Sequence, residues 1–345
     1  MDVRRFYACK QNNVFLLPKF SLSILMKYFT VPPILLILIV FTAFIQLNPV
    51  PEKLPEPSNK VELGKLLFND PILSKGNQIS CASCHKPQYA FADNVPFSFG
   101  VDSLKGTRNT PSAMNLDEHY FFFHDGRAES LEQQAQGPIE NPVEMNLPIS
   151  EAVKKLNKHK QYPAFFMKIF HVAPNKENLL KAIAAFERSL STANSPFDRY
   201  SSRLDTSLFS EAAKRGQALF VNKGKCFNCH FGTDFTTDEF RNIGLFNAKD
   251  LNDSGRYAVS KELADIGRFK VPGLRNVSVT APYMHNGMFK TLSEVIDYYN
   301  EPDKTIPGAI NRDSLLAQPL NLSEKEKKDL EAFLISLTDL SFNKD

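Results

Sequence analysis

Cys81-Ala82-Ser83-Cys84-His85 is a motif that occurs twice in this chain of 345 residues, the second time as Cys226-Phe227-Asn228-Cys229-His230. The repeat indicates how the chain is organised. Two cysteines separated by two residues and followed at once by a histidine form the attachment signature of c-type haem. Each thiol bonds one vinyl group of the porphyrin while the adjoining imidazole reaches the iron. We therefore predict two covalent haem c groups, attached through Cys81, Cys84, Cys226 and Cys229, with His85 and His230 as iron ligands.

Other uses of paired cysteines explain the pattern less well. Zinc half-sites lie about 15–20 residues apart, whereas Cys84 and Cys226 are separated by much of the chain. A thioredoxin-like motif needs neither a second copy nor a following histidine. Structural disulfides would not explain the repeated histidine. Only Cys9 remains outside the two motifs, and its surroundings indicate no role.

Composition fits an ordinary globular protein with an unusual N-terminus. The hydrophobic fraction of 43% is enough for normal cores, and the length favours about two domains. Five of the basic residues fall within residues 1–47, so the remainder is close to neutral despite the overall charge of +3. Nothing in this balance favours nucleic-acid binding.

The N-terminal segment, residues 1–47, is predicted to be a signal or membrane anchor. Residues 34–45 are apolar, which suits the core of a signal peptide, and extension through Val31 and Leu47 approaches spanning length. No clear small-residue cleavage site follows, so an uncleaved anchor is slightly favoured. Met26 is an alternative start. Both options leave the basic end in the cytoplasm and the rest outside, as covalent haem also indicates. Residues 48–58 contain four prolines and read as an extended linker.

The globular part is predicted to be all-α, with two cytochrome c-like domains and long loops. Residues 61–68 and 211–220 have helical spacing, and each run precedes one haem motif. Further helices are expected over residues 177–192 and 323–337, the latter with a Ser323–Glu326 capping box. The predicted domains are residues 59–195 and 196–345.

Several further stretches resemble the dihaem cytochrome c peroxidase family, including its MauG-like branch, whose enzyme oxidises side chains of a partner protein. The resemblance covers roughly residues 59–340 in the family's order and implies the fold of two all-α cytochrome c domains. The matching stretches are Leu63-Gly64-Lys65-Leu66-Leu67-Phe68, Gly106-Thr107-Arg108-Asn109-Thr110-Pro111-Ser112, Asp125-Gly126-Arg127-Ala128, Gly137-Pro138-Ile139-Glu140-Asn141-Pro142-Val143-Glu144-Met145, Ala185-Phe186-Glu187-Arg188 and Thr280-Ala281-Pro282-Tyr283-Met284-His285-Asn286-Gly287.

The resemblance implies a peroxide site at the first haem. The family's peroxide-handling glutamate falls on Glu144 and its companion glutamine on Gln134. A carboxyl there can move a proton between the two peroxide oxygens, so that water leaves. Many relatives have a removable histidine ligand where this chain has Val101. An aliphatic side chain cannot bind iron, so we expect the first iron to be five-coordinate or water-bound, without reductive activation.

The far-side ligand of the second haem is methionine in the peroxidases and tyrosine in the MauG-like branch. The resemblance places Tyr299 there, and a phenolate would favour ferric iron and lower its potential. Met284 and Met288 are the alternatives. Tyr298 is expected to face elsewhere on its helix.

The resemblance also implies two connections between the haems. The family's inter-haem tryptophan aligns with His124, and the chain contains no tryptophan. His124 therefore either replaces it as an electron relay or fills its space. The family's calcium ion would use the Asn109 side chain and the main-chain carbonyls of Thr280 and Pro282. The remaining histidines, His119, His159, His171 and His285, are expected to be structural or exposed.

We therefore expect an extracytoplasmic, anchored dihaem peroxidase that reduces hydrogen peroxide with electrons from a small redox protein such as cytochrome c or a cupredoxin. A MauG-like oxidase that acts on the side chains of a partner protein is the first alternative, favoured by Val101 and Tyr299 but not by the missing tryptophan. The second alternative is a non-catalytic dihaem electron-transfer cytochrome, with both irons six-coordinate and no peroxide turnover.

Overall fold

The computed structural model describes residues 53–342. The predicted signal or anchor, and the first part of the predicted linker, lie outside the described residues. Within residues 53–342, no helix is long and apolar enough to cross a membrane. From Pro55 onward the chain forms one compact unit. The boundary predicted at residues 195 and 196 therefore stays a prediction, and the two parts are called the first and second halves below.

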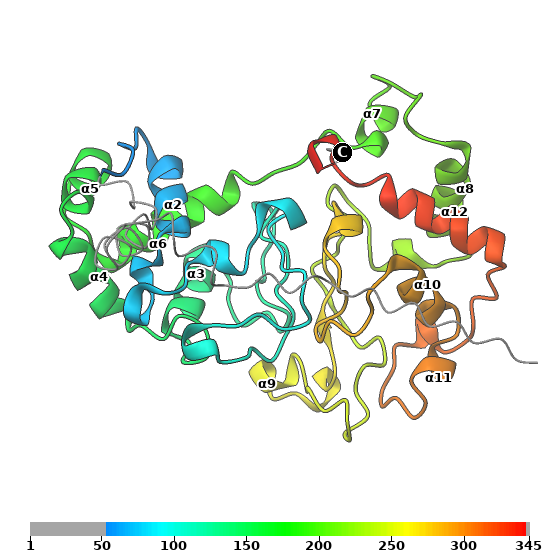
Figure 1. The fold of residues 1–345 in the computed structure, drawn as a ribbon. Helices are drawn as coiled ribbons and strands as arrows, with labels where there is room; N and C mark the ends of the chain where they lie inside the picture. Colours follow the sequence, from blue (N-terminus) through cyan, green and yellow to red (C-terminus); the bar gives the residue numbers. More distant parts are fainter. Residues whose placement is uncertain (1–52, 343–345) are drawn as a thin grey trace, which may run out of the picture. The chain divides into compact units, whose positions relative to one another are not determined.

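Helices dominate the described chain, as predicted, and long loops join them (Figure 1). The only strands among the described residues are β1 (Phe240–Arg241) and β2 (Phe269–Lys270), which pair antiparallel. Short 3-10 turns carry the two haem motifs, η4 (Cys81–Ser83) and η7 (Cys226–Asn228). The α-helices are α2 (Lys60–Asn69), α3 (Leu131–Glu140), α4 (Ile149–Lys158), α5 (Tyr162–Phe170), α6 (Lys176–Arg188), α7 (Pro196–Ser201), α8 (Glu211–Val221), α9 (Tyr257–Ser260), α10 (Leu292–Asn300), α11 (Pro302–Thr305) and α12 (Glu324–Ile335).

Polar side chains set the helix ends. Asn59 accepts a hydrogen bond from the amide of Glu62 and so begins α2. The predicted capping box is present at α12, where Ser323 and Glu326 bond each other's main-chain amides. Each cap satisfies amides that would otherwise lack a partner at a helix start.

Each half contains a helix pair packed in the same way. In the first half α2 packs on α6, and a Cβ added to Gly64 would lie 1.9 Å from the carbonyl oxygen of Ala182. In the second half α8 packs on α12, and a Cβ added to Gly216 would lie 1.9 Å from the carbonyl oxygen of Asp329. Only glycine permits so close an approach of two helices. The matching contacts support the predicted internal repeat.

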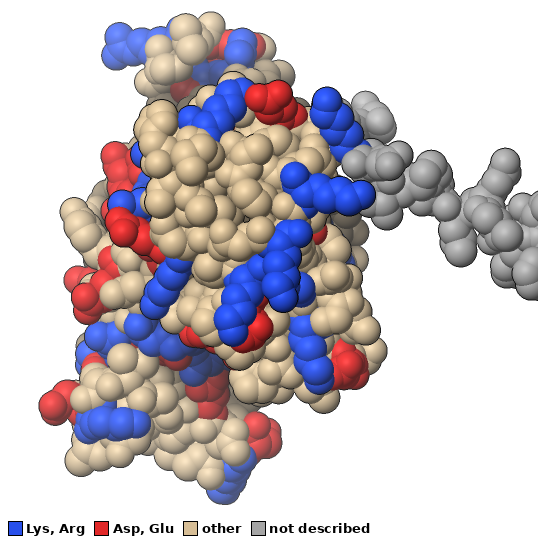
Figure 2. All heavy atoms as spheres, turned by 90° about the vertical axis from the view of Figure 1, so that its left-hand side faces the viewer, with Lys and Arg blue, Asp and Glu red and all other residues tan. Residues whose placement is uncertain are grey.

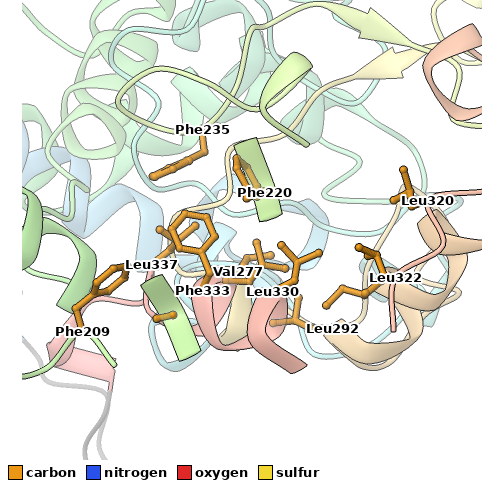
Figure 3. Packing of buried hydrophobic residues seen from close by; sticks show 13 residues of the cluster. Phe209, Phe220, Phe235, Val277, Leu292, Leu320, Leu322, Leu330, Phe333 and Leu337 are labelled. Carbon is orange, nitrogen blue, oxygen red and sulfur yellow. The ribbon is translucent and has the colours of Figure 1, made fainter. Parts of the chain in front are cut away.

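The core of the second half surrounds Phe333 on α12 (Figure 3). Its ring meets Phe220 at 5.1 Å between centroids and Phe235 at 6.2 Å, both edge-to-face. The equivalent residue on α6 is Phe186, which meets Phe68 edge-to-face at 5.0 Å. Such pairs add about 0.5–1.5 kcal/mol each beyond simple burial. Each core reaches one haem motif, because Phe68 lies 6.1 Å from the ring of His85 and Cys226 packs against the cluster around Phe333.

Candidate functional site

The first haem motif forms a tight turn that presents its histidine in a defined orientation. The amide of His85 donates to the carbonyl oxygen of Cys81 at 2.9 Å, which closes the turn. The ring atom Nδ1 of His85 lies 2.8 Å from the carbonyl oxygen of Phe91 and donates a proton to it. This bond leaves Nε2 unprotonated and able to bind a metal, the arrangement usual for a ligating histidine.

The second motif repeats this geometry. The amide of His230 donates to the carbonyl oxygen of Cys226 at 2.9 Å. Its Nδ1 donates to the carbonyl oxygen of Phe235, also at 2.9 Å. Burial lowers the pKa of both His85 and His230, so each imidazole is neutral, as iron ligation requires.

The four motif cysteines are free thiols in partly buried positions. Burial raises the pKa of the Cys81 thiol, and raises that of Cys226 to about 12. Paired thiols beside a neutral, oriented imidazole fit covalent haem at both positions.

Val101 and Glu144 lie side by side near the first motif. The amide of Val101 donates to the carbonyl oxygen of Glu144 at 2.8 Å, and Val101 is buried. The carboxylate of Glu144 accepts a 2.6 Å hydrogen bond from Nδ2 of Asn141. Its charge contributes to the raised pKa of the thiols of both Cys81 and Cys84, so it lies within electrostatic reach of the attachment turn.

Burial raises the pKa of Glu144, although nearby Arg127 and the Asn141 hydrogen bond oppose the shift. The carboxyl therefore holds its proton more readily than a surface acid. Gln134 lies on α3, half-buried, and its side chain forms no hydrogen bond within residues 53–342. The structure thus brings Glu144 to Val101, whereas no hydrogen bond joins the Gln134 side chain to either within residues 53–342.

The adjacent tyrosines of α10 have different surroundings. Tyr298 is fully buried, and its hydroxyl donates to the carbonyl oxygen of Ile243 at 2.5 Å. Burial raises the pKa of Tyr299, and the thiols of Cys226 and Cys229 contribute to the shift. Tyr299 therefore faces the second haem motif, and Tyr298 faces away from it.

Met284 and Met288 pack in the cluster that contains Tyr298, and Tyr299 packs against the same cluster. The choice of Tyr299 over Met284 or Met288 as a haem ligand therefore stays a prediction.

A polar network joins the two halves of the described chain. His124 Nε2 lies 2.8 Å from the carbonyl oxygen of Asn109, and the amide of Lys270 donates to the carbonyl oxygen of His124 at 2.8 Å. Burial lowers the pKa of His124 to about 4, so its ring is neutral. Arg108 binds Asp125 at 2.6 Å and Asp253 of the second half at 2.7 Å.

Sequence reasoning gave Arg108 and Asp253 no role and expected His285 to be structural or exposed. His285 is buried and stacks on Phe269, with 3.8 Å between ring centroids and 10° between planes. Burial lowers the pKa of His285 to about 3. Arg108 and His285 lie within stretches that match the family, and this match was the sequence signal available for them. No nearby sequence pattern indicates a role for Asp253.

The other three histidines differ in their surroundings. His119 pairs with Asp238 across the halves at 2.6 Å. The ring of His159 packs on that of Tyr162, and His171 is exposed at the end of α5. These contacts agree with the expectation that these histidines are structural or exposed.

Comparison with known proteins identifies the family to which the chain belongs. The sequence profile of the family described as di-haem cytochrome c peroxidase matches residues 58–206. The methylamine utilization protein MauG of Methylorubrum extorquens is 38% identical over 297 residues, covering 83% of this chain and 82% of that protein. This chain belongs to the di-haem cytochrome c peroxidase family.

Other relatives agree with this membership. The cytochrome c551 peroxidase of Pseudomonas aeruginosa is 36% identical over 263 residues, covering 72% of this chain and 75% of that protein. The cytochrome c peroxidase Ccp of Escherichia coli is 40% identical over 255 residues, covering 72% of this chain and 54% of that one. The crystal structure of a MauG-like protein associated with microbial copper homeostasis superposes with a TM-score of 0.75 and 31% identity, covering 84% of this chain and 91% of that one.

The predicted family, the peroxidase-type oxidoreductase and the two haems are thereby confirmed. The mainly helical dihaem fold is confirmed as well.

Proposed function

We propose that this dihaem peroxidase reduces hydrogen peroxide to water outside the cytoplasm, with electrons from a small redox protein such as a cytochrome c or a cupredoxin. The pairing of Val101 with Glu144 beside the first motif carries this proposal most directly. When bound, the first haem would supply an iron that activates peroxide, and the second an iron that passes electrons to it. The residues around them would control access and protons.

Val101 keeps one position open. Its side chain offers no atom that binds iron, and its main chain is bonded to Glu144 rather than free to move away. His85 would supply the iron ligand from the first motif. This arrangement favours a resting site that admits peroxide without prior reduction.

Glu144 would hold and move the proton. Its raised pKa makes the carboxylate a stronger base than that of a surface acid, and the Asn141 amide fixes the orientation of the carboxyl. A carboxyl so held can take a proton from the near oxygen of peroxide and deliver it to the far one. Gln134, on the neighbouring helix, would assist by hydrogen bonding to peroxide.

Tyr299 and His230 would both ligate the second iron. The electrostatic reach from Tyr299 to both second-motif thiols supports it over Tyr298. His124 would relay electrons between the halves, because it is neutral, buried and bonded to both of them.

A calcium ion would bind between the halves. Asn109 is buried, and its Nδ2 donates to the carbonyl oxygen of Val95 at 3.1 Å, which leaves Oδ1 available. The carbonyl oxygens of Thr280 and Pro282 accept no hydrogen bond within the described chain. Three uncommitted oxygens, completed by water, suit calcium.

The second candidate function is MauG-like oxidation of side chains on a partner protein. Val101 together with Tyr299 favours it, whereas the absence of tryptophan from the chain disfavours a close copy of that route. The N-terminal apolar segment supports export with the protein either anchored in the inner membrane or released by cleavage.

Ferric EPR of the purified protein, with mass measurement of the two attached haems, tests the proposal. A high-spin signal beside a low-spin one is expected, whereas two low-spin signals would support the non-catalytic cytochrome instead. Steady-state assay with peroxide and reduced cytochrome c then separates the peroxidase from the MauG-like oxidase, since only the peroxidase turns over rapidly with this donor.

A further inference from the structure

Positive charge is concentrated on the outer helices of the first half. Residues 149–172, which contain α4, α5 and their flanking loops, include five lysines and one acidic residue. The other residues from 59 onward include 30 basic and 34 acidic side chains, a net charge of −4. Figure 2 views the side of the molecule where α4 and α5 lie, and Lys and Arg side chains gather on it. The surface of residues 149–172 is called the basic face below.

Most of this charge is not neutralised by the protein itself. Lys158 and Lys160 are exposed and form no ion pair within the described chain. Lys154 pairs with Glu151 on its own helix, but both side chains are about half exposed or more, at 64% and 48%. Surface pairs of this kind contribute little and exchange readily. Lys155 differs, because its ammonium group donates a hydrogen bond to the carbonyl oxygen of Ser74 and so stabilises the fold.

Exposed apolar side chains lie among these lysines. Met167 is 52% exposed and Val172 is 41% exposed, on and just after α5. The opposite side of α5 is anchored in the protein by Phe165 and Phe166, which are buried. Apolar side chains beside lysines, on an element that lies flat on the surface, are typical of segments that rest in the headgroup layer of a membrane.

The described chain begins against this same face. Glu56, in the predicted linker, pairs with Lys168 of α5 at 2.7 Å. Lys60, at the start of α2, lies over the ring of Phe170 at 5.4 Å. The predicted apolar segment ends at Leu47, so the chain from there to Glu56 spans at most about 30 Å. A membrane that holds the N-terminal segment would therefore lie within reach of the basic face.

We infer that the basic face docks on anionic lipid headgroups at the membrane surface. An acidic redox protein is the other occupant that the charge would suit. It is disfavoured because α4 and α5 carry neither haem motif, and the first attachment turn packs against α2. An electron donor needs a short path to a haem, and neither attachment turn belongs to the basic face, whereas a lipid surface needs no path to either haem.

Co-sedimentation with lipid vesicles tests the inference on residues 55–345, the compact unit, purified with both haems. Binding is expected to vesicles that contain phosphatidylglycerol, to weaken at high salt, and to be absent with phosphatidylcholine alone. The triple variant Lys154→Gln, Lys158→Gln, Lys160→Gln should bind about a hundredfold more weakly, because each lysine near such a surface contributes about 1 kcal/mol. Met167→Ser should cause a smaller, several-fold loss that persists at high salt.

A matched triple variant removes the same charge elsewhere. Lys249→Gln, Lys261→Gln and Lys304→Gln alter exposed lysines of the second half and should leave vesicle binding unchanged. Peroxide turnover should be unaffected in both triple variants, which distinguishes this surface from the haem sites. Equal loss in the two triple variants, or no affinity for anionic vesicles, would overturn the inference. So would capture of an acidic cupredoxin or cytochrome by the basic face in place of vesicles.

Discussion

The amide of Val101 donates a 2.8 Å hydrogen bond to the carbonyl oxygen of Glu144, and this bond joins two loops that are distant in the sequence. The residue proposed to leave an iron position open and the residue proposed to handle the proton are thus held by one contact. The contact depends on Gly100, where an added Cβ would lie 2.2 Å from the carbonyl oxygen of Val143. Peroxide chemistry at the first haem would therefore depend on the packing of these loops as well as on the side chains.

Glu144→Gln should lower peroxide turnover by about a hundredfold or more, because the amide keeps the shape of the carboxyl but cannot carry its proton. Steady-state assay with reduced cytochrome c measures the loss. Glu140→Gln is the matched control, since Glu140 is exposed in the same segment and bonds Gln136. Similar rates in the two variants would remove Glu144 from the mechanism. The ferric EPR spectrum should not change in either.

Gly100→Ala should displace the Glu144 loop, because the new methyl group would overlap main-chain atoms rather than a flexible side chain. We expect a loss of about 1–3 kcal/mol in the free energy of unfolding, together with lower turnover. Gly106→Ala is the control, since its nearest neighbour, the carbonyl oxygen of Ser98, is 3.3 Å away. Chemical denaturation followed by circular dichroism makes the comparison. Equal stability of both variants would show that the loop contact tolerates movement.

Tyr299→Met should raise the reduction potential of the second haem, because a thioether stabilises ferrous iron better than a phenolate does. A spectroelectrochemical titration reports each haem separately, and the first haem serves as the internal reference. Tyr298→Phe should leave both potentials unchanged while lowering stability by about 1 kcal/mol, since it loses the hydrogen bond to Ile243. A shift in potential with Tyr298→Phe rather than with Tyr299→Met would reverse the assignment.

The features that sequence predicted best were those set by local spacing. The haem motifs, the helices before them and the Ser323–Glu326 capping box each depend on residues a few positions apart. The length of α6 was less accurate: helical periodicity predicted residues 177–192, but the helix ends at Arg188 and the chain then extends. The residues after Arg188 are bonded to distant partners, as where Thr192 accepts from Asn115.

The network between the halves could not be predicted in the same way. Arg108 meets Asp253 far along the chain, and no local pattern marks such a pair. His285 was recognised as part of a motif, yet its stacking on Phe269 depends on how the two segments fold together. The assignment of Glu144 came from the family resemblance, because a single loop carboxylate carries no distinguishing pattern of its own.

Asp253→Asn should weaken the connection between the halves, because Arg108 would keep only Asp125 as an anionic partner. The pair is largely shielded from solvent, so we expect a loss of about 1–3 kcal/mol in the free energy of unfolding. Asp250→Asn is a suitable control, since Asp250 is exposed nearby and bonds only to Asn247 through its side chain. Comparable denaturation midpoints for the two variants would contradict a structural role for the Arg108 bridge.

Glu187 makes the stability of the first half depend on pH. Its side chain is buried, with Oε2 lacking a hydrogen-bond partner within residues 53–342, and burial raises its pKa to about 8. An unfolded glutamate titrates near pH 4.3. Between these values the folded chain keeps a proton that the unfolded chain has lost, so the free energy of unfolding should fall as pH rises from about 4.3 to 8.

Glu187→Leu should abolish this dependence and stabilise the protein most at the alkaline end of that range. Leucine is a reasonable substitute because α12 places Leu334 directly after Phe333, as α6 places Glu187 directly after Phe186. Urea denaturation at a series of pH values measures the effect, with Glu177→Leu as the control because Glu177 is exposed on the same helix. If the two variants show the same pH profile as the unaltered protein, Glu187 is not the titrating group. In that case the presence of Glu187 in the core would need another explanation. A buried carboxyl without a hydrogen-bond partner destabilises the folded protein, whereas a buried leucine does not.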